Sequence, residues 1–267
     1  MDYINFRLNK MPKPQAITAY LLERAYGIFA GLAFTVVTIP TICLMLVTPG
    51  ETNRRRVARR AAGLVLRLAG TGPSVTGFEH LPASACVVVA NHASYLDGII
   101  LTAVLPPRFT FVIKREMTSV PFAHFLLRRL GSEFIDRTGR HRGTVDARRI
   151  MRKAQKQRSL AFFPEGTFGP EPGLRRFHAG AFAAALRGDL PIVPIVIRGS
   201  RQILPAHQLI PIPSRISVII KPIVNPERDE ISPADLIRAC RQRILEDLNE
   251  PDIADFSDSQ KKTSEIT

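Results

Sequence analysis

Residues 86–98 read CVVVANHASYLDG, an apolar run that ends in a polar Asn-His pair just before a predicted helix. The run is short, β-branched and uncharged, which is typical of a buried strand. Ser94 and Asp97 have the spacing of a helix capping box, so a helix is expected to begin there. His92 is therefore predicted to lie at a strand-to-helix corner, the part of an α/β protein where binding and reacting residues gather.

His92 and Asp97 are candidates for a general base and the carboxylate that orients it. Imidazole can accept a proton near neutral pH, and five residues of separation let the chain fold back so that the two side chains meet. The structural alternative is that Asp97 serves only as half of the capping box. A serine hydrolase is not favoured, because Ala93-Ser94-Tyr95 lacks both glycines of a nucleophile elbow.

Strands and helices alternate along the chain from residue 75 to residue 250. This alternation indicates an α/β fold with a mixed, mostly parallel sheet covered by helices. Three predicted strands end in a charged or titratable candidate, His92, Lys114 or Glu165, and we expect these residues to converge on one edge of the sheet. A dinucleotide-binding fold is excluded because no Gly-x-Gly-x-x-Gly follows the first strand.

Four sequence blocks, in order, resemble the motifs of the glycerolipid acyltransferases, the family that includes the lysophosphatidic acid acyltransferases. The blocks are Asn91-His92 with Asp97, Lys114 with GSEFIDR at 131–137, FPEGT at 163–167, and LPIVPIV at 190–196. Any one block is a weak signal, but four in the family's order and spacing make the resemblance specific. It covers roughly residues 75 to 225.

The resemblance implies an enzyme that moves a fatty acyl group from acyl-CoA or acyl-carrier protein to a hydroxyl of a lysophospholipid, in the first place 1-acylglycerol-3-phosphate. It implies no cofactor and no metal ion. His92 would be the base and Asp97 its orienting partner. The implied substrate-binding residues are Lys114, Arg137, Glu165, Gly166 and Thr167. Glu165 has three alternatives: it bonds the acceptor hydroxyl, orients Arg137, or is a buried structural carboxylate.

The third block departs from the family pattern at one position. Glu-Gly-Thr is usually followed by an arginine, whereas here Phe168 follows and the next basic residues are Arg175 and Arg176. Either arginine could fold back across the intervening loop and supply the missing phosphate contact. Otherwise the acceptor is a lysolipid with a weaker need for such contacts, a diester or an amino-acid lipid, with Phe168 packed on its apolar part.

The net charge of +14 is concentrated in the part of the chain that carries the motifs. Residues 1–224 hold 31 Lys and Arg against 12 Asp and Glu, which favours phosphorylated substrates, an anionic membrane surface or nucleic acid. Residues 137–158 hold nine basic residues but no interleaved aromatic residue, so no nucleic-acid partner is expected. The three cysteines have no metal-ligand spacing.

Residues 25–47 are uncharged, and as a helix they would extend about 35 Å, enough for a bilayer core of roughly 30 Å. Pro40 is expected to kink or break this helix, so a spanning segment and an interfacial hairpin remain open. Five arginines between residues 54 and 60 indicate the cytoplasmic side. We therefore expect a membrane-associated protein whose catalytic domain lies on the cytoplasmic face.

The expected organisation is a membrane-associating helical region at 1–66, an acyltransferase domain at 67–250 and a polar, disordered tail at 251–267. Two other function classes remain open. One is a lipid hydrolase that uses His92 with water in place of an acceptor alcohol. The other is a non-catalytic basic protein that binds a membrane surface or nucleic acid.

Overall fold

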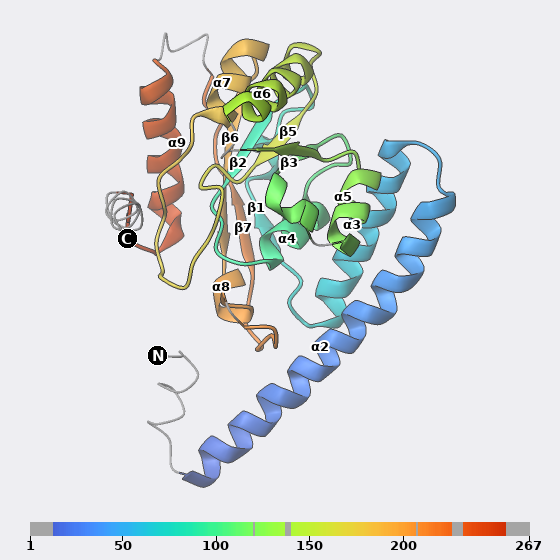
Figure 1. Cartoon of the computed structure of the whole chain (residues 1–267). Coiled ribbons are helices and arrows are strands. Elements are labelled where there is room, and N and C mark those ends of the chain that lie inside the picture. The colour runs from blue at the N-terminus through green and yellow to red at the C-terminus, as the bar shows by residue number, and fades with distance from the viewer. Residues whose placement is uncertain (1–12, 120, 137–139, 207, 226–231, 255–267) are drawn as a thin grey trace.

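A computed structural model describes residues 13–119, 121–136, 140–206, 208–225 and 232–254 (Figure 1). Its centre is one seven-stranded sheet with the strand order β1-β7-β6-β2-β5-β3-β4. The strands are β1 Ser74–Thr76, β2 Val87–Ala90, β3 Thr110–Lys114, β4 Glu133–Ile135, β5 Leu160–Phe162, β6 Ile192–Arg198 and β7 Ser217–Ile220. Only the β6–β7 pairing is antiparallel among these seven strands. The predicted mixed, mostly parallel sheet is confirmed.

Helices cover both faces of the sheet and bury two separate hydrophobic clusters. Two helices form the N-terminal region. The α-helices after them are α4 Leu96–Val104, α5 Pro121–Arg129, α6 Arg140–Gln155, α7 Gly180–Gly188, α8 Ser200–Ile203 and α9 Pro233–Leu248. Short 3-10 helices occupy Phe78–His80 and Arg115–Ser119. Helices α6, α7 and α9 pack on one face of the sheet. Helix α4 and the C-terminal end of α3 (Glu51–Leu68) pack on the other face. The central strand β2 is therefore buried on both faces, as its uncharged run predicts.

The N-terminal region is a helical hairpin. Helix α2 (Lys13–Val47) continues through Pro40, and α3 (Glu51–Leu68) returns beside it. The hydroxyl of Tyr26 donates a hydrogen bond of 2.9 Å to the carbonyl of Ala69, which fastens α2 to the end of α3. Of the kink or break expected at Pro40, the break does not occur, since one helix runs from Lys13 to Val47.

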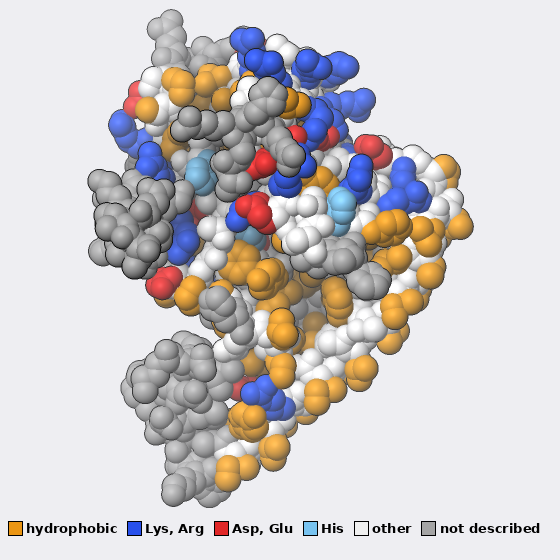
Figure 2. All heavy atoms as spheres, viewed as in Figure 1, with side chains coloured by type: hydrophobic (Ala, Val, Ile, Leu, Met, Phe, Trp, Pro, Cys, Tyr) orange, Lys and Arg blue, Asp and Glu red, His pale blue; other side chains and the backbone are white. Residues whose placement is uncertain are grey.

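The outer surface of α2 is apolar and exposed. Figure 2 shows hydrophobic side chains along most of its length, and Figure 1 shows that its N-terminal half extends away from the sheet. Residues 17–47 form the one described helix that is long and apolar enough to cross a membrane, by length and composition. An exposed helix of this composition suits membrane association.

Two arginines of the cluster at 54–60 attach α3 to the domain. Arg55 donates hydrogen bonds to the carbonyl of Leu130 at 2.7 Å and to the hydroxyl of Thr110 at 3.0 Å. Arg59 donates to the carbonyls of Ala103 and Val104, the last turn of α4. Part of the charge that the sequence assigns to a membrane signal therefore stabilises the packing of α3 instead.

Both expected domain boundaries fall inside packed structure. The boundary at residues 66 and 67 lies within α3, which ends at Leu68. Residues 251–254 are bound to the domain, because the amide of Leu174 donates to the carbonyl of Pro251 at 2.8 Å and the amide of Ile253 donates back at 3.1 Å. The rest of the expected tail, residues 255–267, lies outside the described residues.

Candidate active site

The corner between β2 and α4 brings His92 and Asp97 together. Nδ1 of His92 lies 2.9 Å from Oδ2 of Asp97, which is fully buried. The side chain of Asn91 holds the end of β2 against β6, because it donates to the carbonyl of Ile197 at 2.9 Å and accepts from its amide at 2.7 Å. The predicted meeting of imidazole and carboxylate is present in the structure, and the base lies on a fixed strand end.

The same carboxylate also caps the start of α4. Oδ2 of Asp97 accepts the backbone amides of Ala93 at 2.6 Å and Ser94 at 2.8 Å, while the hydroxyl of Ser94 accepts the amide of Leu96 at 3.1 Å. Asp97 therefore makes both predicted contacts, one with the imidazole and one with the start of the helix. Three N–H donors on one oxygen suit an acceptor-only carboxylate, and the imidazole that donates through Nδ1 leaves Nε2 free to accept a proton.

Two phenylalanines enclose the imidazole of His92. The ring of Phe163 is stacked on it at a centroid distance of 4.2 Å, and Phe168 meets it edge-on at 4.5 Å. Phe168 also contacts the ring of Tyr95 at 4.8 Å. The His92 side chain is 18% exposed, so the base is reached from solvent only over a small part of its surface.

Glu165 joins the third block to the corner through the backbone. Its Oε1 accepts the amide of His92 at 2.7 Å, and its Oε2 accepts the amide of Arg175 at 2.8 Å. Burial raises the pKa of Glu165 to about 8, although these two amides act to lower it. Both oxygens are occupied by main-chain donors, which is the geometry of the structural alternative rather than of a group directed at a substrate.

Gly166 and Thr167 form the turn that follows Glu165. Gly166 adopts a left-handed conformation with φ of 75°, and its amide donates to the carbonyl of Phe163 at 3.0 Å. That amide is therefore committed within the turn. Thr167 is exposed, and its hydroxyl makes only a 3.5 Å contact with the carbonyl of Phe168, so of the two it is the donor that a ligand can reach.

The two basic residues of the second block lie farther along the sheet edge. Lys114 is the last residue of β3, is half-exposed and pairs with Glu116 at 3.1 Å. Strand β5 lies between β3 and β2, and all three strands are parallel, so Lys114 shares an edge with His92 and Glu165 as predicted. Arg137, which follows β4 in the sequence, lies outside the described residues.

Two arginines that secure the loop at 163–176 extend the candidate site. Arg175 folds back so closely that a Cβ added to Gly169 would lie 2.9 Å from its guanidinium, and it pairs with Glu171 at 3.6 Å. Arg201 donates to the carbonyl of Gly169 at 2.7 Å and pairs with Glu250 at 3.1 Å. The sequence nominates Arg175 as a candidate but gives no signal for Arg201, whose partners are 32 and 49 residues away.

The site contains residues for acid–base chemistry and none grouped for metal binding. Among the described residues, no group of three or more His, Cys, Asp or Glu side chains could hold a metal ion. The arrangement of an oriented imidazole, an apolar enclosure and nearby cations can activate a hydroxyl beside an anionic group.

A family model described as Acyltransferase matches residues 72–198. The chain is 27% identical over 227 residues to the 1-acyl-sn-glycerol-3-phosphate acyltransferase of Saccharomyces cerevisiae, covering 83% of this chain and 74% of that protein. It is 34% identical over 181 residues to a chloroplastic 1-acyl-sn-glycerol-3-phosphate acyltransferase of Brassica napus, covering 66% of this chain and 50% of that protein.

Two further comparisons bear on the acceptor and on the fold. The chain is 34% identical over 168 residues to a lyso-ornithine lipid O-acyltransferase of Pseudomonas aeruginosa, covering 61% of this chain and 60% of that protein. The crystal structure of the 1-acyl-sn-glycerophosphate acyltransferase of Thermotoga maritima superposes with a TM-score of 0.68 at 20% identity, covering 84% of this chain and 92% of that one. The chain and the Thermotoga enzyme share one fold.

Proposed function

We propose that the chain is a member of the acyltransferase family and transfers a fatty acyl group from a thioester to a free hydroxyl of a lysophospholipid. The observation that carries the proposal is the 2.9 Å contact between Nδ1 of His92 and Oδ2 of Asp97. This contact fixes the imidazole so that Nε2 is available to the acceptor hydroxyl.

The reaction needs one base and no covalent enzyme intermediate. Nε2 of His92 takes the proton of the acceptor hydroxyl while the oxygen attacks the thioester carbonyl carbon. The tetrahedral intermediate then expels the thiolate, which receives the proton held by the imidazolium. Asp97 keeps the ring in the orientation that both transfers require and stabilises its charged form. The balance is an ester and a free thiol from an alcohol and a thioester.

The first candidate acceptor is 1-acylglycerol-3-phosphate, with acyl-CoA or acyl-carrier protein as donor. Arg175 supports this choice, because its guanidinium folds back to Gly169, the residue after Phe168. A guanidinium there can contact a phosphate that an arginine at position 168 would otherwise bind. Lys114, Arg137 and the exposed hydroxyl of Thr167 remain the further phosphate-binding candidates.

A second candidate acceptor is an amino-acid lysolipid. The apolar contact of Phe168 with His92 at 4.5 Å favours it, because a phenyl ring beside the base offers no bond to phosphate. The likeness to the Pseudomonas lyso-ornithine lipid enzyme supports the same choice. In this case Phe168 would pack on the apolar part of the acceptor.

Membrane attachment through α2 fits a lipid acceptor and a lipid product. The exposed apolar surface of α2 supports attachment, and the arginines of α3 support a catalytic domain on the cytoplasmic face. Basic residues flank the uncharged stretch on both sides, Arg24 before it and the arginines at 54–60 after it, which favours an interfacial position over a perpendicular span. Cysteine accessibility to membrane-impermeant reagents on closed vesicles, with single cysteines at exposed positions of α6, tests the orientation.

The basic surface of α6 is partly used within the domain, which weakens a nucleic-acid role. Arg149 pairs with Glu133 at 2.5 Å and with Asp146 at 3.1 Å, and Lys153 pairs with Glu133 at 2.6 Å. Asp146 also binds Arg115 at 2.7 Å, and these partners hold the pKa of Asp146 below its usual range. These charges form an internal network rather than a free basic face.

Lipid mass spectrometry tests the proposed reaction and both acceptors. The full-length protein in detergent is incubated with acyl-CoA or acyl-carrier protein and an equimolar mixture of lysophosphatidate, lysophosphatidylcholine and lyso-ornithine lipid. His92→Ala is the inactive variant, and His178→Ala, an exposed histidine outside the cluster, is the matched control. The expected result is an acylated lysophosphatidate that forms with the control and not with His92→Ala.

Each other outcome has a defined meaning. Preferential acylation of lyso-ornithine lipid replaces the first acceptor by the second. Release of free fatty acid without any acylated product identifies a hydrolase and overturns the proposal. Equal product with His92→Ala and His178→Ala removes His92 as the base.

A further inference from the structure

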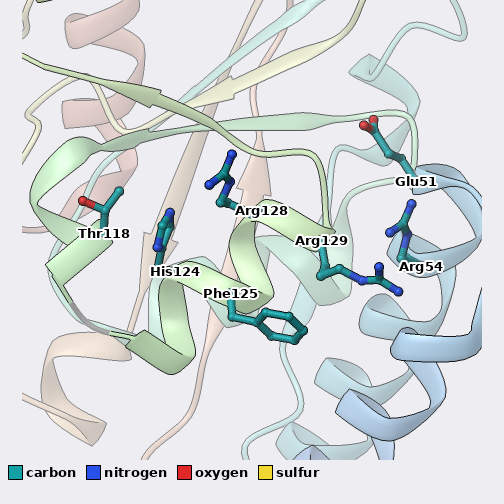
Figure 3. Close-up of a pocket in the computed structure, with 7 residues that line it drawn as sticks. All are labelled: Glu51, Arg54, Thr118, His124, Phe125, Arg128 and Arg129. Carbon is teal, nitrogen blue, oxygen red and sulfur yellow. The ribbon is translucent and has the colours of Figure 1, made fainter.

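A separate open pocket of about 570 Å³ lies between the start of α3, the segment after β3 and α5 (Figure 3). Its volume falls within the roughly 300–1,000 Å³ of small-ligand sites. None of the residues that line it belongs to the cluster around His92. The pocket is therefore a candidate for a second binding function.

Three of the seven residues that line this pocket are arginines. Arg54, Arg128 and Arg129 line it together with His124 and one carboxylate, that of Glu51 (Figure 3). Glu51 is paired with Arg55 of the next helical turn at 3.4 Å, so part of its charge is already balanced. The remaining excess of positive charge favours an anionic ligand.

Two of the three arginines retain donors that a ligand can use. Within the described part of the chain, the side chain of Arg128 makes no hydrogen bond and no ion pair, and the side chain of Arg54 donates only to the carbonyl of Gly50 at 3.3 Å. The Nε of Arg129 is buried and has no hydrogen-bond partner among the described residues. Guanidinium groups with free donors are the groups that proteins use to bind phosphate through two parallel hydrogen bonds.

Arg129 connects this pocket to the end of the apolar helix. Its Nη2 donates to the carbonyls of Met45 and Leu46, each at 2.7 Å, in the last turn of α2. The side chains of Leu46 and Val47 are exposed there, and Phe125 of the pocket itself is 43% exposed. Figure 2 shows the apolar surface of α2 running up to the basic side chains at this end. The arginines of the pocket are thus bordered by apolar surface.

We propose that this pocket binds the phosphate of an anionic membrane phospholipid, at a site separate from the acyl acceptor. The inference rests on the proposed membrane attachment of α2. An interfacial helix buries its apolar face at the boundary of the acyl chains, which brings groups at its end to the depth of the lipid head groups. Arg54 and Arg128 then hold the phosphate, while Phe125 and the end of α2 contact the acyl chains.

Vesicle binding by the full-length protein tests the site. Sedimentation is measured with vesicles of phosphatidylcholine alone and of phosphatidylcholine with phosphatidylglycerol. Arg128→Lys is the decisive variant, because it keeps the charge and loses the bidentate geometry. The matched control is Arg60→Lys on α3, at an exposed arginine whose side chain makes no hydrogen bond or ion pair within the described residues.

The expected result is that Arg128→Lys lowers the affinity for phosphatidylglycerol vesicles about three- to tenfold, with no change for phosphatidylcholine and none in Arg60→Lys. A diffuse attraction between the basic protein and the anionic membrane predicts a different result. Each basic residue near the membrane surface would then contribute equally, and removal of its charge would lower the affinity about fivefold. Unchanged affinity in Arg128→Lys overturns the proposal. Equal losses in Arg128→Gln and Arg60→Gln also overturn it.

The source of the phosphate is tested on the detergent-solubilised protein by the rise in Tm with each ligand. Dihexanoyl phosphatidylglycerol should raise the Tm of the wild type more than that of Arg128→Lys at the same concentration, and inorganic phosphate should raise neither. An equal rise with inorganic phosphate identifies a free-phosphate site and overturns the lipid assignment. A rise with CoA that Arg128→Lys abolishes assigns the pocket to the donor and overturns it likewise.

The catalytic variant separates this inference from the proposed reaction. His92→Ala should lose acyl transfer and keep the full preference for phosphatidylglycerol vesicles. Retained transfer in His92→Ala would contradict the proposed function and leave the pocket unaffected. Loss of vesicle preference in His92→Ala would contradict a separate site.

Discussion

The corner at residues 91–97 and the loop at 163–176 both hold His92, but they do so by different means. The corner orients the imidazole through Asp97, five residues away at 2.9 Å. The loop reaches the same residue from 73 positions farther along the chain, through the 2.7 Å bond from the His92 amide to Glu165 and through the stacked ring of Phe163. The imidazole of His92 is therefore oriented by local structure and held in place by tertiary structure.

The first prediction tests the local pair of His92 and Asp97. His92→Ala should lower kcat at least about 10³-fold, and Asp97→Asn about 10²–10⁴-fold, because the base is lost in one and misoriented in the other. Single-turnover acyl transfer measures both. Circular dichroism of each variant controls for folding, since Asp97 also caps α4. Activity in Asp97→Asn within threefold of wild type would assign the carboxylate to capping alone.

Glu165→Gln tests the tertiary contact between the loop at 163–176 and the His92 amide. An amide nitrogen cannot accept, so one of the two backbone N–H groups that face the side chain loses its partner, at a cost of about 1–3 kcal/mol. We expect kcat to fall about 10- to 100-fold with the acceptor KM nearly unchanged, because the position of His92 shifts while the acceptor contacts remain. Glu171→Gln, at an exposed glutamate of the same loop, is the control. A rise in acceptor KM alone would instead indicate a direct substrate contact.

The raised pKa of Glu165 predicts a pH dependence of stability. With its pKa near 8 in the folded protein and 4.5 when unfolded, the folded state holds a proton that the unfolded state releases between these values. Stability should therefore fall as pH rises from about 4.5 to 8, by up to about 1.4 kcal/mol per pH unit from this group, and level off above. Apparent Tm measured from pH 5 to 8 should fall more steeply in wild type than in Glu165→Gln. Parallel curves for the two proteins would refute the raised pKa.

Arg175→Ala tests whether the C-terminal end of the loop at 163–176 contributes to acceptor binding. If its guanidinium contacts the acceptor phosphate, the acceptor KM should rise about three- to tenfold while the donor KM stays constant. The neighbouring Arg176→Ala is the matched variant and should change the acceptor KM less. Equal rises in both donor and acceptor KM would assign Arg175 to loop structure.

The smallest expected effect concerns Phe168. Phe168→Leu keeps an apolar side chain but removes the edge contact with His92, so kcat should fall only about two- to fivefold, the order of one aromatic contact. Phe168→Arg should shift preference from lyso-ornithine lipid toward lysophosphatidate in the mixed-acceptor assay. An unchanged ratio of products would show that position 168 does not determine the acceptor.

The helical hairpin shows which structural features the sequence pattern predicts and which it does not. The uncharged run before residue 47 predicts an apolar helix, and α2 is one, but the pattern does not show that α2 passes Pro40 without ending. The arginines after residue 53 read as a membrane signal, yet Arg55 and Arg59 bind carbonyls at residues 130 and 103. Charge clusters predict a surface, and only the packing distinguishes a lipid-facing arginine from one that caps a neighbouring helix.

The sequence by itself determined the class of fold and the pairing of His92 with Asp97. The hydrophobic periodicity of the sequence predicts which segments become strands. The separation of five positions between His92 and Asp97 brings imidazole and carboxylate together with little help from the rest of the chain. The strand pattern and the His92–Asp97 pairing both depend on backbone geometry within a few residues of the chain. The alternation of strands and helices likewise predicted a mostly parallel sheet whose carboxyl edge carries His92, Lys114 and Glu165.

Only the tertiary structure decided what Glu165 and Phe168 do. Sheet order places β5 directly beside β2, and that neighbour relation turns a glutamate predicted to bind substrate into a bridge between two backbone amides. The same relation brings Phe168 against the imidazole and lets Arg201 secure the loop. Contacts between segments more than 30 residues apart depend on strand order and on burial, and neither quantity is expressed in the local pattern of the sequence.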